Sequence, residues 1–210
     1  MKKRLRLFIC IVSMLVMVAC GSEKEISSPI SEEDIVIDLQ GNSEYVKYYN
    51  GIEELKEDAE VVVLGEVIDI ETIATNGVIW TKETVEVSES FMGDYEQGDI
   101  IYVCKQNGIV TLREYLETLS GARLNFIKRD ISEYSESDYD KNYISMTNQG
   151  DPISVVGSVS IYFLYKTTTP EKLFPDITDA YERVGDMMGE LRKLINDKFT
   201  YLSTSYSVEE

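Results

Sequence analysis

A predicted hairpin in the first half of the chain constrains the fold more than any other feature. Residues Val61–Ile70 are rich in β-branched side chains, which favour strands, and Gly65 among them indicates a bulge. Asn76-Gly77 is a dipeptide typical of a two-residue hairpin turn. The residues that follow, Val78–Phe91, predict a second strand, one face of which carries Ile79, Thr81, Val85 and Val87.

Shorter elements follow the hairpin. Apolar and alternating runs predict strands at Ile100–Cys104 and Gly157–Lys166. Thr111 with Glu114 three residues later is a capping box, and it predicts a short amphipathic helix that ends near Gly121. We therefore expect a mainly β fold with short helices.

The C-terminal residues 180–202 fit two structures. An apolar face suits a helix, but Gly185 and Gly189 would each weaken that helix by about 1 kcal/mol. A turn at Asn196-Asp197 would instead lead into a strand. The β-hairpin is favoured, and the helix stays open as the alternative.

The N-terminus has the three parts of a secretory signal peptide. A basic start is followed by an apolar run, Leu7–Val18, and by the small residue Ala19. The run is too short to span a membrane, which takes about 20 residues. We therefore predict a signal peptide over residues 1–19. Its basic residues are Lys2, Lys3, Arg4 and Arg6.

The residues at the end of this segment, Met17-Val18-Ala19-Cys20, resemble the lipobox of bacterial lipoproteins, in which Leu is commoner at the position of Met17. In that family the cysteine is acylated, for example with palmitate, and several chains give a stable anchor where a single chain is marginal. The resemblance implies that Cys20 is lipidated and holds an extracytoplasmic protein to the bacterial cell membrane. A plain signal peptide with an incidental cysteine is the alternative. Residues 20–44 then predict a flexible acidic tether, and residues 45–210 a single domain.

Charge and composition exclude several classes of function. The formal charge of −18 becomes −22 when residues 1–19, with four positive charges and no negative ones, are removed. Such a chain repels nucleic acid and anionic lipid, so we expect no nucleic-acid partner and a membrane contact made through the lipid. The chain has no histidine, which removes Ser-His-Asp and Cys-His catalysis and histidine zinc sites. We expect no cofactor.

A second resemblance covers residues 51–166. Glu57–Val67, then Thr84–Val87, with Gly93 and Gly98-Asp99-Ile100 after them, follow a pattern that recurs in uncharacterised secreted and lipid-anchored bacterial proteins. The same order resembles netrin-like and tissue-inhibitor-like domains of the OB type. It implies a small OB-like β-barrel with one or two short helices packed at its end.

This chain departs from that pattern in ways that bear on function. Thr84 stands where an aromatic residue is preferred, and Met92 where lysine is usual. Disulfides of the animal domains cannot form, because Cys104 is the only cysteine that follows Cys20. Metalloprotease inhibition in that family uses a free N-terminal cysteine, so acylation of Cys20 would exclude it here.

A predicted polar insertion, residues 128–151, carries one candidate site and most residues of a second. Its carboxylates are candidate ligands for Ca²⁺, which takes six to eight oxygens, although the spacing matches no EF-hand and a solvated acidic loop is favoured. They are Asp130, Glu133, Glu136, Asp138 and Asp140. Rigid, amphipathic aromatics are candidate partner contacts, with core or rim packing as the alternative. They are Tyr134, Tyr139, Tyr143 and, in the second strand, Trp80.

These features favour a non-enzymatic binding module of the cell envelope. Loops at one mouth of the barrel would bind an unknown protein or an envelope polymer. The first alternative is a carboxylate-based polysaccharide hydrolase, which needs two carboxyl groups roughly 5–10 Å apart and one raised pKa. The second is a Ca²⁺-dependent adhesion or sensor module.

Overall fold

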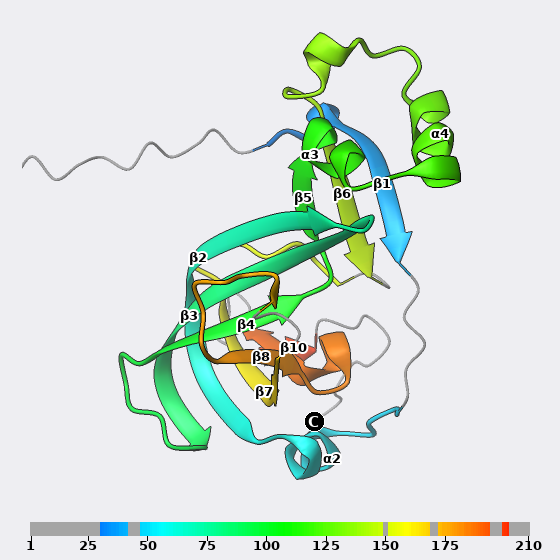
Figure 1. The fold of residues 1–210 in the computed structure, drawn as a ribbon. Helices are drawn as coiled ribbons and strands as arrows, with labels where there is room; N and C mark the ends of the chain where they lie inside the picture. The colour runs from blue at the N-terminus through cyan, green and yellow to red at the C-terminus, as the bar shows by residue number, and fades with distance from the viewer. Residues whose placement is uncertain (1–29, 42–46, 149–150, 169–171, 194–198, 202–210) are drawn as a thin grey trace, which may run out of the picture. The chain divides into compact units, whose positions relative to one another are not determined.

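Two fifteen-residue strands, β2 (Val61–Thr75) and β3 (Val78–Met92), form a long hairpin in the computed structural model (Figure 1). Asn76 and Gly77 join them with φ angles of 50° and 75°, as a type I′ turn requires. The register shifts between Leu64 and Gly65. A Cβ on Gly65 would lie 2.4 Å from a methyl group of Val85, so only glycine allows this close approach. The predicted hairpin and bulge are confirmed.

The structure describes residues 30–41, 47–148, 151–168, 172–193 and 199–201. The chain divides into two units, Met1–Glu32 and Glu33–Glu210, and every described strand belongs to the second. Besides β2 and β3, the strands are β1 (Ile35–Gly41), β4 (Ile100–Lys105), β5 (Gly108–Thr111), β6 (Tyr143–Asn148), β7 (Val159–Thr167), β8 (Ala180–Arg183), β9 (Glu190–Lys193) and β10 (Phe199–Tyr201). The helices are α2 (Ile52–Asp58), α3 (Leu112–Glu117) and α4 (Gly121–Asp130), with 3₁₀ turns η1 (Glu32–Asp34), η2 (Glu136–Asp138) and η4 (Asp186–Gly189).

Five strands of the larger sheet pair in a ring. The sheet order is β10-β9-β7-β2-β3-β4-β8, and β8 also pairs with β7. The parallel pair β4–β8 meets at one residue pair, Val103 with Tyr181, so the sheet is only partly closed there. Numbered along the chain, the ring strands follow the order 1-2-3-5-4, which suits a partly open, OB-like Greek-key arrangement. The predicted fold class is confirmed as mainly β with short helices, and the larger sheet is partly closed.

A second sheet has three strands in the order β1-β6-β5 and corrects two predictions. The tether was predicted to extend to residue 44, but Ile35–Gly41 form β1, which pairs in parallel with β6. Residues 128–151 were predicted as a polar insertion, but α4 includes residues 128–130 and Tyr143–Asn148 form β6. The physical reason is packing, because Leu39 and Ile144 join the apolar cluster beneath α3.

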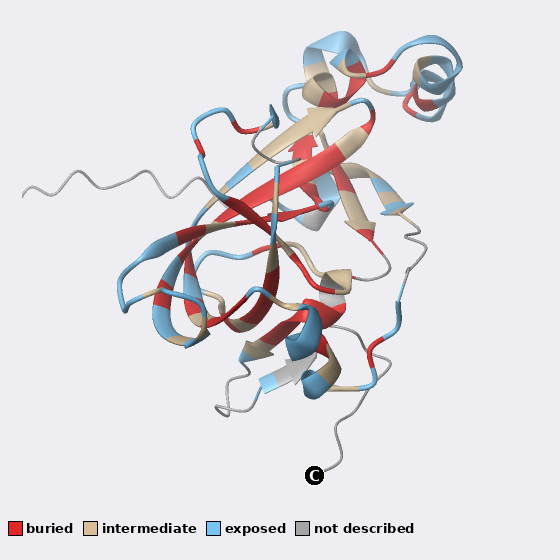
Figure 2. Ribbon diagram, turned by 60° about the horizontal axis from the view of Figure 1, so that its bottom comes forward, coloured by how far each residue is buried: buried red, intermediate tan, exposed pale blue. Residues whose placement is uncertain are grey.

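Helix α3 lies where the two sheets meet, against β2 of the larger sheet and β5 and β6 of the smaller one. Thr111 Oγ1 accepts a hydrogen bond from the Glu114 backbone N–H at 3.2 Å, so the predicted helix cap is confirmed. The Tyr115 hydroxyl donates to the Gly77 carbonyl at 3.1 Å, which ties α3 to the turn of the hairpin. In contrast, α2 and α4 each bury a single residue, Leu55 and Ile127 (Figure 2).

The C-terminal part is built from strands. β9 and β10 pair antiparallel, so the favoured hairpin is confirmed; the turn expected at residues 196–197 lies outside the described residues. Within the described ranges, no helix has the length and apolar character needed to cross a membrane.

Candidate functional site

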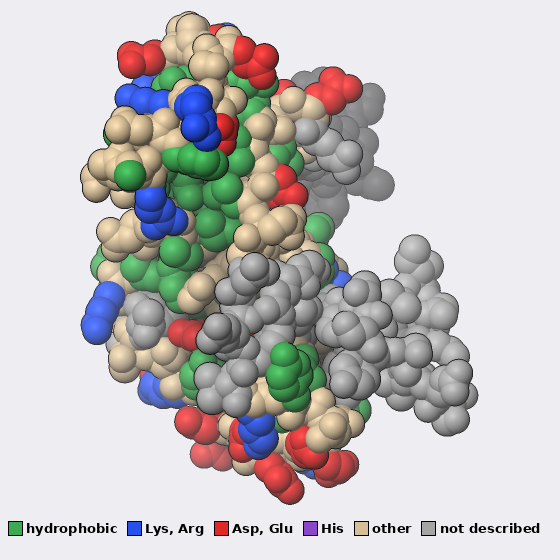
Figure 3. All heavy atoms as spheres, turned by 90° about the vertical axis from the view of Figure 1, so that its right-hand side faces the viewer, with side chains coloured by type: hydrophobic (Ala, Val, Ile, Leu, Met, Phe, Trp, Pro, Cys, Tyr) green, Lys and Arg blue, Asp and Glu red, His purple; other side chains and the backbone are tan. Residues whose placement is uncertain are grey.

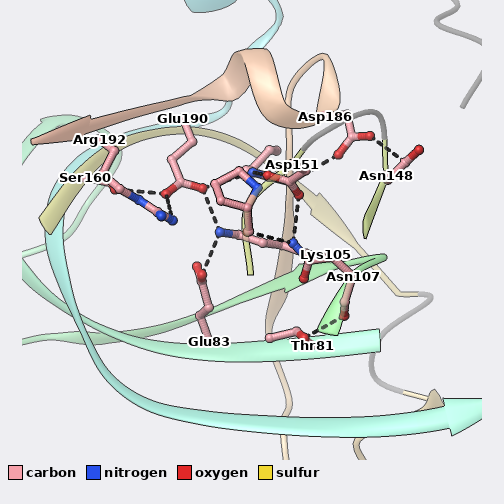
Figure 4. Close-up of polar contacts among 12 residues, drawn as sticks. Thr81, Glu83, Lys105, Asn107, Asn148, Asp151, Ser160, Asp186, Glu190 and Arg192 are labelled. Atoms are coloured by element: carbon pink, nitrogen blue, oxygen red, sulfur yellow. Dashed lines mark hydrogen bonds and ion pairs between the residues drawn. The ribbon is translucent and has the colours of Figure 1, made fainter. Parts of the chain in front are cut away.

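A group of charged side chains lies buried inside the ring of strands (Figure 4). Lys105 ends β4, and its Nζ is 2.6 Å from Glu83 Oε1 on β3 and 2.6 Å from Glu190 Oε2 on β9. All three side chains are fully buried. An unpaired charge at such a depth would cost several kcal/mol, so the opposite charges in contact are what allow these groups to be inside the protein.

Arg183, at the end of β8, is the second buried cation. It binds Asp151 at two points, with Nη2 2.5 Å from Oδ2 and Nη1 3.0 Å from Oδ1. The same guanidinium donates to Glu190 at 3.0 Å and to Asp186 at 3.1 Å. A guanidinium held at two points is fixed in orientation as well as in position. We call Glu83, Lys105, Asp151, Arg183, Asp186 and Glu190 the buried ion network.

Neutral side chains supply further hydrogen bonds to these carboxylates. The donors come from β6 and β7 and from the turn before β5, so the network ties both sheets together. The bonds are Ser160 to Glu190 (2.9 Å), Tyr162 to Glu83 (3.2 Å), Asn107 to Asp151 (2.9 Å) and Asn148 to Asp186 (2.9 Å).

Burial and neighbouring charges shift the pKa values of the network in opposite directions. Burial alone would raise the pKa of Glu190, but Lys105 and Arg183 outweigh it and hold that pKa well below its usual range. Burial would lower the pKa of Arg183, but Asp151 and Glu190 keep it well above its ordinary value. Glu190 and Arg183 are therefore both ionised at neutral pH.

Asp186 differs from the other carboxylates of the network. Burial raises the pKa of Asp186 above its ordinary value, and Arg183 offsets this only in part. The side chain is 30% exposed, and the backbone has a φ of 57°, a conformation that costs a non-glycine residue about 1 kcal/mol or more. A strained residue with a perturbed carboxyl at the edge of a buried network is a candidate functional group.

A cavity of about 480 Å³ opens beside Asp186. Its volume lies within the range typical of small-ligand sites. Lys105 and Arg183 contribute to its wall, so the network supports the cavity directly. Six other side chains of the wall are aromatic or acidic: Tyr49, Asp58, Trp80, Tyr165, Glu182 and Asp186.

The carboxylates of the cavity wall are held by neighbours. Asp58 accepts hydrogen bonds from Lys47 Nζ and from the Tyr49 hydroxyl, each at 2.7 Å. The Tyr165 hydroxyl donates to Glu182 at 2.9 Å. Burial, and then Asp58, raises the pKa of Tyr49 to about 12, so this phenol is neutral at neutral pH. The cavity thus presents oriented carboxylates next to neutral aromatic rings.

Of the aromatic residues predicted as contacts, only Trp80 reaches this cavity. Trp80 is 9% exposed and packs with Cys104 and Phe174 while also lining the wall. Tyr134 and Tyr139 pack against the apolar cluster beneath α3. Tyr143 pairs with Ile35 and Thr111 in the smaller sheet.

The predicted metal ligands do not come together. Asp140 pairs with Arg113 at 2.6 Å, Asp138 accepts a hydrogen bond from Ser135 at 2.6 Å, and Asp130 lies 3.6 Å from its neighbour Arg129. Across the described residues, which include the candidates Glu133 and Glu136, no group of three or more possible ligands is arranged to hold a metal ion. Cys20 lies outside the described residues.

Sequence reasoning missed the buried ion network, although part of it has a signal. Glu83 has the same parity as Thr81 and Val85 on the predicted inward face of the second strand, and Lys105 continues the alternation of Ile101 and Val103. A charge at an inward position predicts a buried partner. The partner Glu190 has no such local signal.

Comparison with known proteins leaves the site to be interpreted from its own geometry. No family model matches the chain, and no curated protein or solved structure shows a significant match.

Proposed function

We propose that the protein is a lipid-anchored, non-enzymatic binding module of the cell envelope, and that the cavity beside Asp186 binds a glycan segment of an envelope polymer. One observation carries the ligand class. Three aromatic side chains and three carboxylates held by neighbours line the same cavity. The anchor and the location rest on the signal-peptide and lipobox pattern before Cys20.

A sugar matches both kinds of group. The apolar faces of a pyranose ring pack on aromatic side chains such as Trp80 and Tyr165, whose rings are rigid and amphipathic. Sugar hydroxyls donate to carboxylates such as Glu182, and a hydrogen bond to a charged group contributes about 1.5–3 kcal/mol. Because the acids already have partners, a neutral ligand brings no unbalanced charge into the cavity. OB-type folds also bind oligosaccharides through loops at one end.

A polysaccharide hydrolase is the second candidate, and Asp186 is the observation that favours it. A carboxyl with a raised pKa is what a general acid requires, and Glu182 lines the same cavity. Binding is favoured because Arg183 lies 3.1 Å from Asp186 and stabilises its ionised form, whereas a general acid must carry a proton.

Calorimetric titration of the full chain with chitotetraose, and with glycans released from cell walls by digestion, tests the proposal. We expect saturable binding that Glu182→Gln weakens about tenfold or more, since one charge-assisted hydrogen bond is lost. Glu53→Gln, the same change on the first turn of α2, is the control and leaves the affinity unchanged. Absence of binding to either glycan refutes the proposal.

Two further measurements on the same samples distinguish the binding module from a hydrolase and from a calcium-dependent module. Shorter oligosaccharides appearing on prolonged incubation, and lost in Asp186→Asn, would replace the binding module with a hydrolase. Loss of binding in a chelator, restored by Ca²⁺, would instead support the calcium-dependent module. The proposal expects an unchanged oligosaccharide and no effect of the chelator.

A further inference from the structure

A second hollow, of about 630 Å³, lies between α4, β1, β6 and the turn of the β2–β3 hairpin. Most of the side chains that line it are apolar, and they include Leu39, Val78, Leu119, Phe126, Ile127 and Met146. Phe126 is 55% exposed, which is unusual for a large aromatic residue. Figure 3 shows hydrophobic side chains gathered on the face that carries α4, with Lys and Arg side chains next to them. We call this hollow the α4 groove.

The charge of α4 is opposite to that of the chain as a whole. The helix carries the exposed residues Arg123, Lys128 and Arg129 against a single acid, Asp130, whereas the full chain has a formal charge of −18. Arg129 also lies over the Phe126 ring, 4.9 Å from its centroid. A basic and apolar surface is therefore concentrated on one ten-residue helix.

Arg123 brings this positive charge to the groove itself. It lines the groove, and its guanidinium donates to the carbonyls of Asn76 at 3.1 Å and Gly77 at 3.5 Å. A guanidinium has five N–H donors, so two carbonyl contacts leave donors for an anion. The geometry combines an apolar hollow with a cation at its rim.

We propose that the α4 groove binds an acyl chain of an anionic membrane lipid, whose headgroup lies against Arg123. An acyl chain matches the apolar lining, and an anionic headgroup matches the basic rim, where each basic residue near such a surface favours binding. An apolar peptide would fill the groove but would leave the concentration of Lys and Arg without a partner. The groove thus adds a specific lipid contact to an otherwise acidic surface, and this proposal does not rest on the proposed glycan site.

Short-range quenching by brominated lipid tests this contact. The full chain carrying Phe126→Trp is mixed with vesicles of phosphatidylcholine and one third phosphatidylglycerol, with bromine on the acyl chains of one lipid at a time. We expect strong quenching by brominated phosphatidylglycerol and weak quenching by brominated phosphatidylcholine. The parent chain, whose only tryptophan is Trp80 in the other cavity, stays unquenched.

Two charge reversals test whether the groove or the total charge of the chain causes the preference for phosphatidylglycerol. Arg123→Glu in the Phe126→Trp chain is expected to reduce the preference for phosphatidylglycerol about fivefold or more. Lys56→Glu on α2 makes the same change in net charge elsewhere and should keep the preference; thermal melting verifies that both variants fold. Equal quenching by the two lipids, no quenching, or an equal effect of both reversals overturns the proposal. A blue-shifted emission that depends on protein concentration without lipid also overturns it, because a second copy would then cover the groove.

Discussion

Replacement of Glu190 by glutamine tests whether the charges of the buried ion network stabilise the fold. Glutamine keeps the shape of the side chain, so no cavity forms. Lys105 and Arg183, which lie 2.6 Å and 3.0 Å from Glu190 Oε2, lose the negative charge beside them. The amide N–H₂ of the new residue would also face cations or donors where a carboxylate accepted hydrogen bonds. Removing one partner of a buried ion pair costs about 3–5 kcal/mol. For a domain of this size, this lowers the melting temperature by about 6–20 °C.

The effect of Glu190→Gln should depend on pH with a definite sign. The folded-state pKa of Glu190 lies below the unfolded value of 4.5. The stability that this group contributes is therefore fully present above about pH 4.5 and is lost as the pH falls through the folded pKa. The difference in unfolding free energy between the parent and Glu190→Gln should be largest near neutral pH and should shrink below about pH 4.5.

Urea unfolding of the full chain, followed by circular dichroism and by Trp80 emission at several pH values, measures this difference. Glu53→Gln is the matched control, because the exposed side chain on α2 undergoes the same chemical change. Its free energy of unfolding should change by less than about 0.5 kcal/mol. A cost below about 1 kcal/mol for Glu190→Gln at neutral pH, or a cost that does not vary with pH, would refute the assigned role of the network.

Three other predictions follow from single sites. Burial, and then Glu182, raises the pKa of Cys104 to about 12, so the thiol should resist alkylation near neutral pH in the native chain and react only in urea; rapid native labelling would contradict this. Gly77→Ala should cost about 1–3 kcal/mol in urea unfolding, because φ is +75° and a Cβ would lie 2.8 Å from Leu119, whereas Gly51→Ala, with nothing within 4 Å, should cost far less. Protein recovered from its native membrane should begin at a lipid-bearing Cys20 by intact mass, and Cys20→Ala should be released or unprocessed; an unlipidated parent chain would refute the anchor.

The long elements of the fold could be predicted because their signals are local. The turn at Asn76-Gly77 and the β-branched runs on each side specify β2 and β3 without reference to the rest of the chain. β1 and β6 could not be predicted in this way. Their pairing joins Ile35 to Tyr143, more than a hundred positions apart, and each strand gains its stability from packing in the smaller sheet. Local propensity is a weak guide when tertiary contacts decide the outcome.

Residues of the candidate site could be predicted only where the residue type itself is informative. Trp80 was singled out because it is the sole tryptophan, and it does line the cavity. Asp186 was not singled out. It is a candidate functional group because its backbone is strained and its carboxylate contacts Arg183, and neither feature leaves a pattern in the sequence. The carboxylates of residues 128–151 were candidate Ca²⁺ ligands, with a solvated acidic loop favoured. Arg113 and Ser135 bind Asp140 and Asp138 separately, and spacing in the sequence does not show such individual partners.

The two proposed sites meet at the end of β6. We therefore expect that binding at one site changes the affinity of the other through the buried ion network. Asn148 lines both the glycan cavity and the α4 groove. Its amide donates to Asp186 at 2.9 Å, and Asp186 contacts Arg183 at 3.1 Å, so a shift of Asn148 alters the surroundings of a carboxylate in the cavity wall. Lipid that displaces Asn148 should therefore change the affinity for chitotetraose. Binding free energies are reciprocal, so chitotetraose must change the affinity for lipid by the same factor. Asn148→Ala should remove this coupling while leaving each ligand able to bind alone. An affinity of the parent chain for chitotetraose that lipid does not change would refute the link between the two sites.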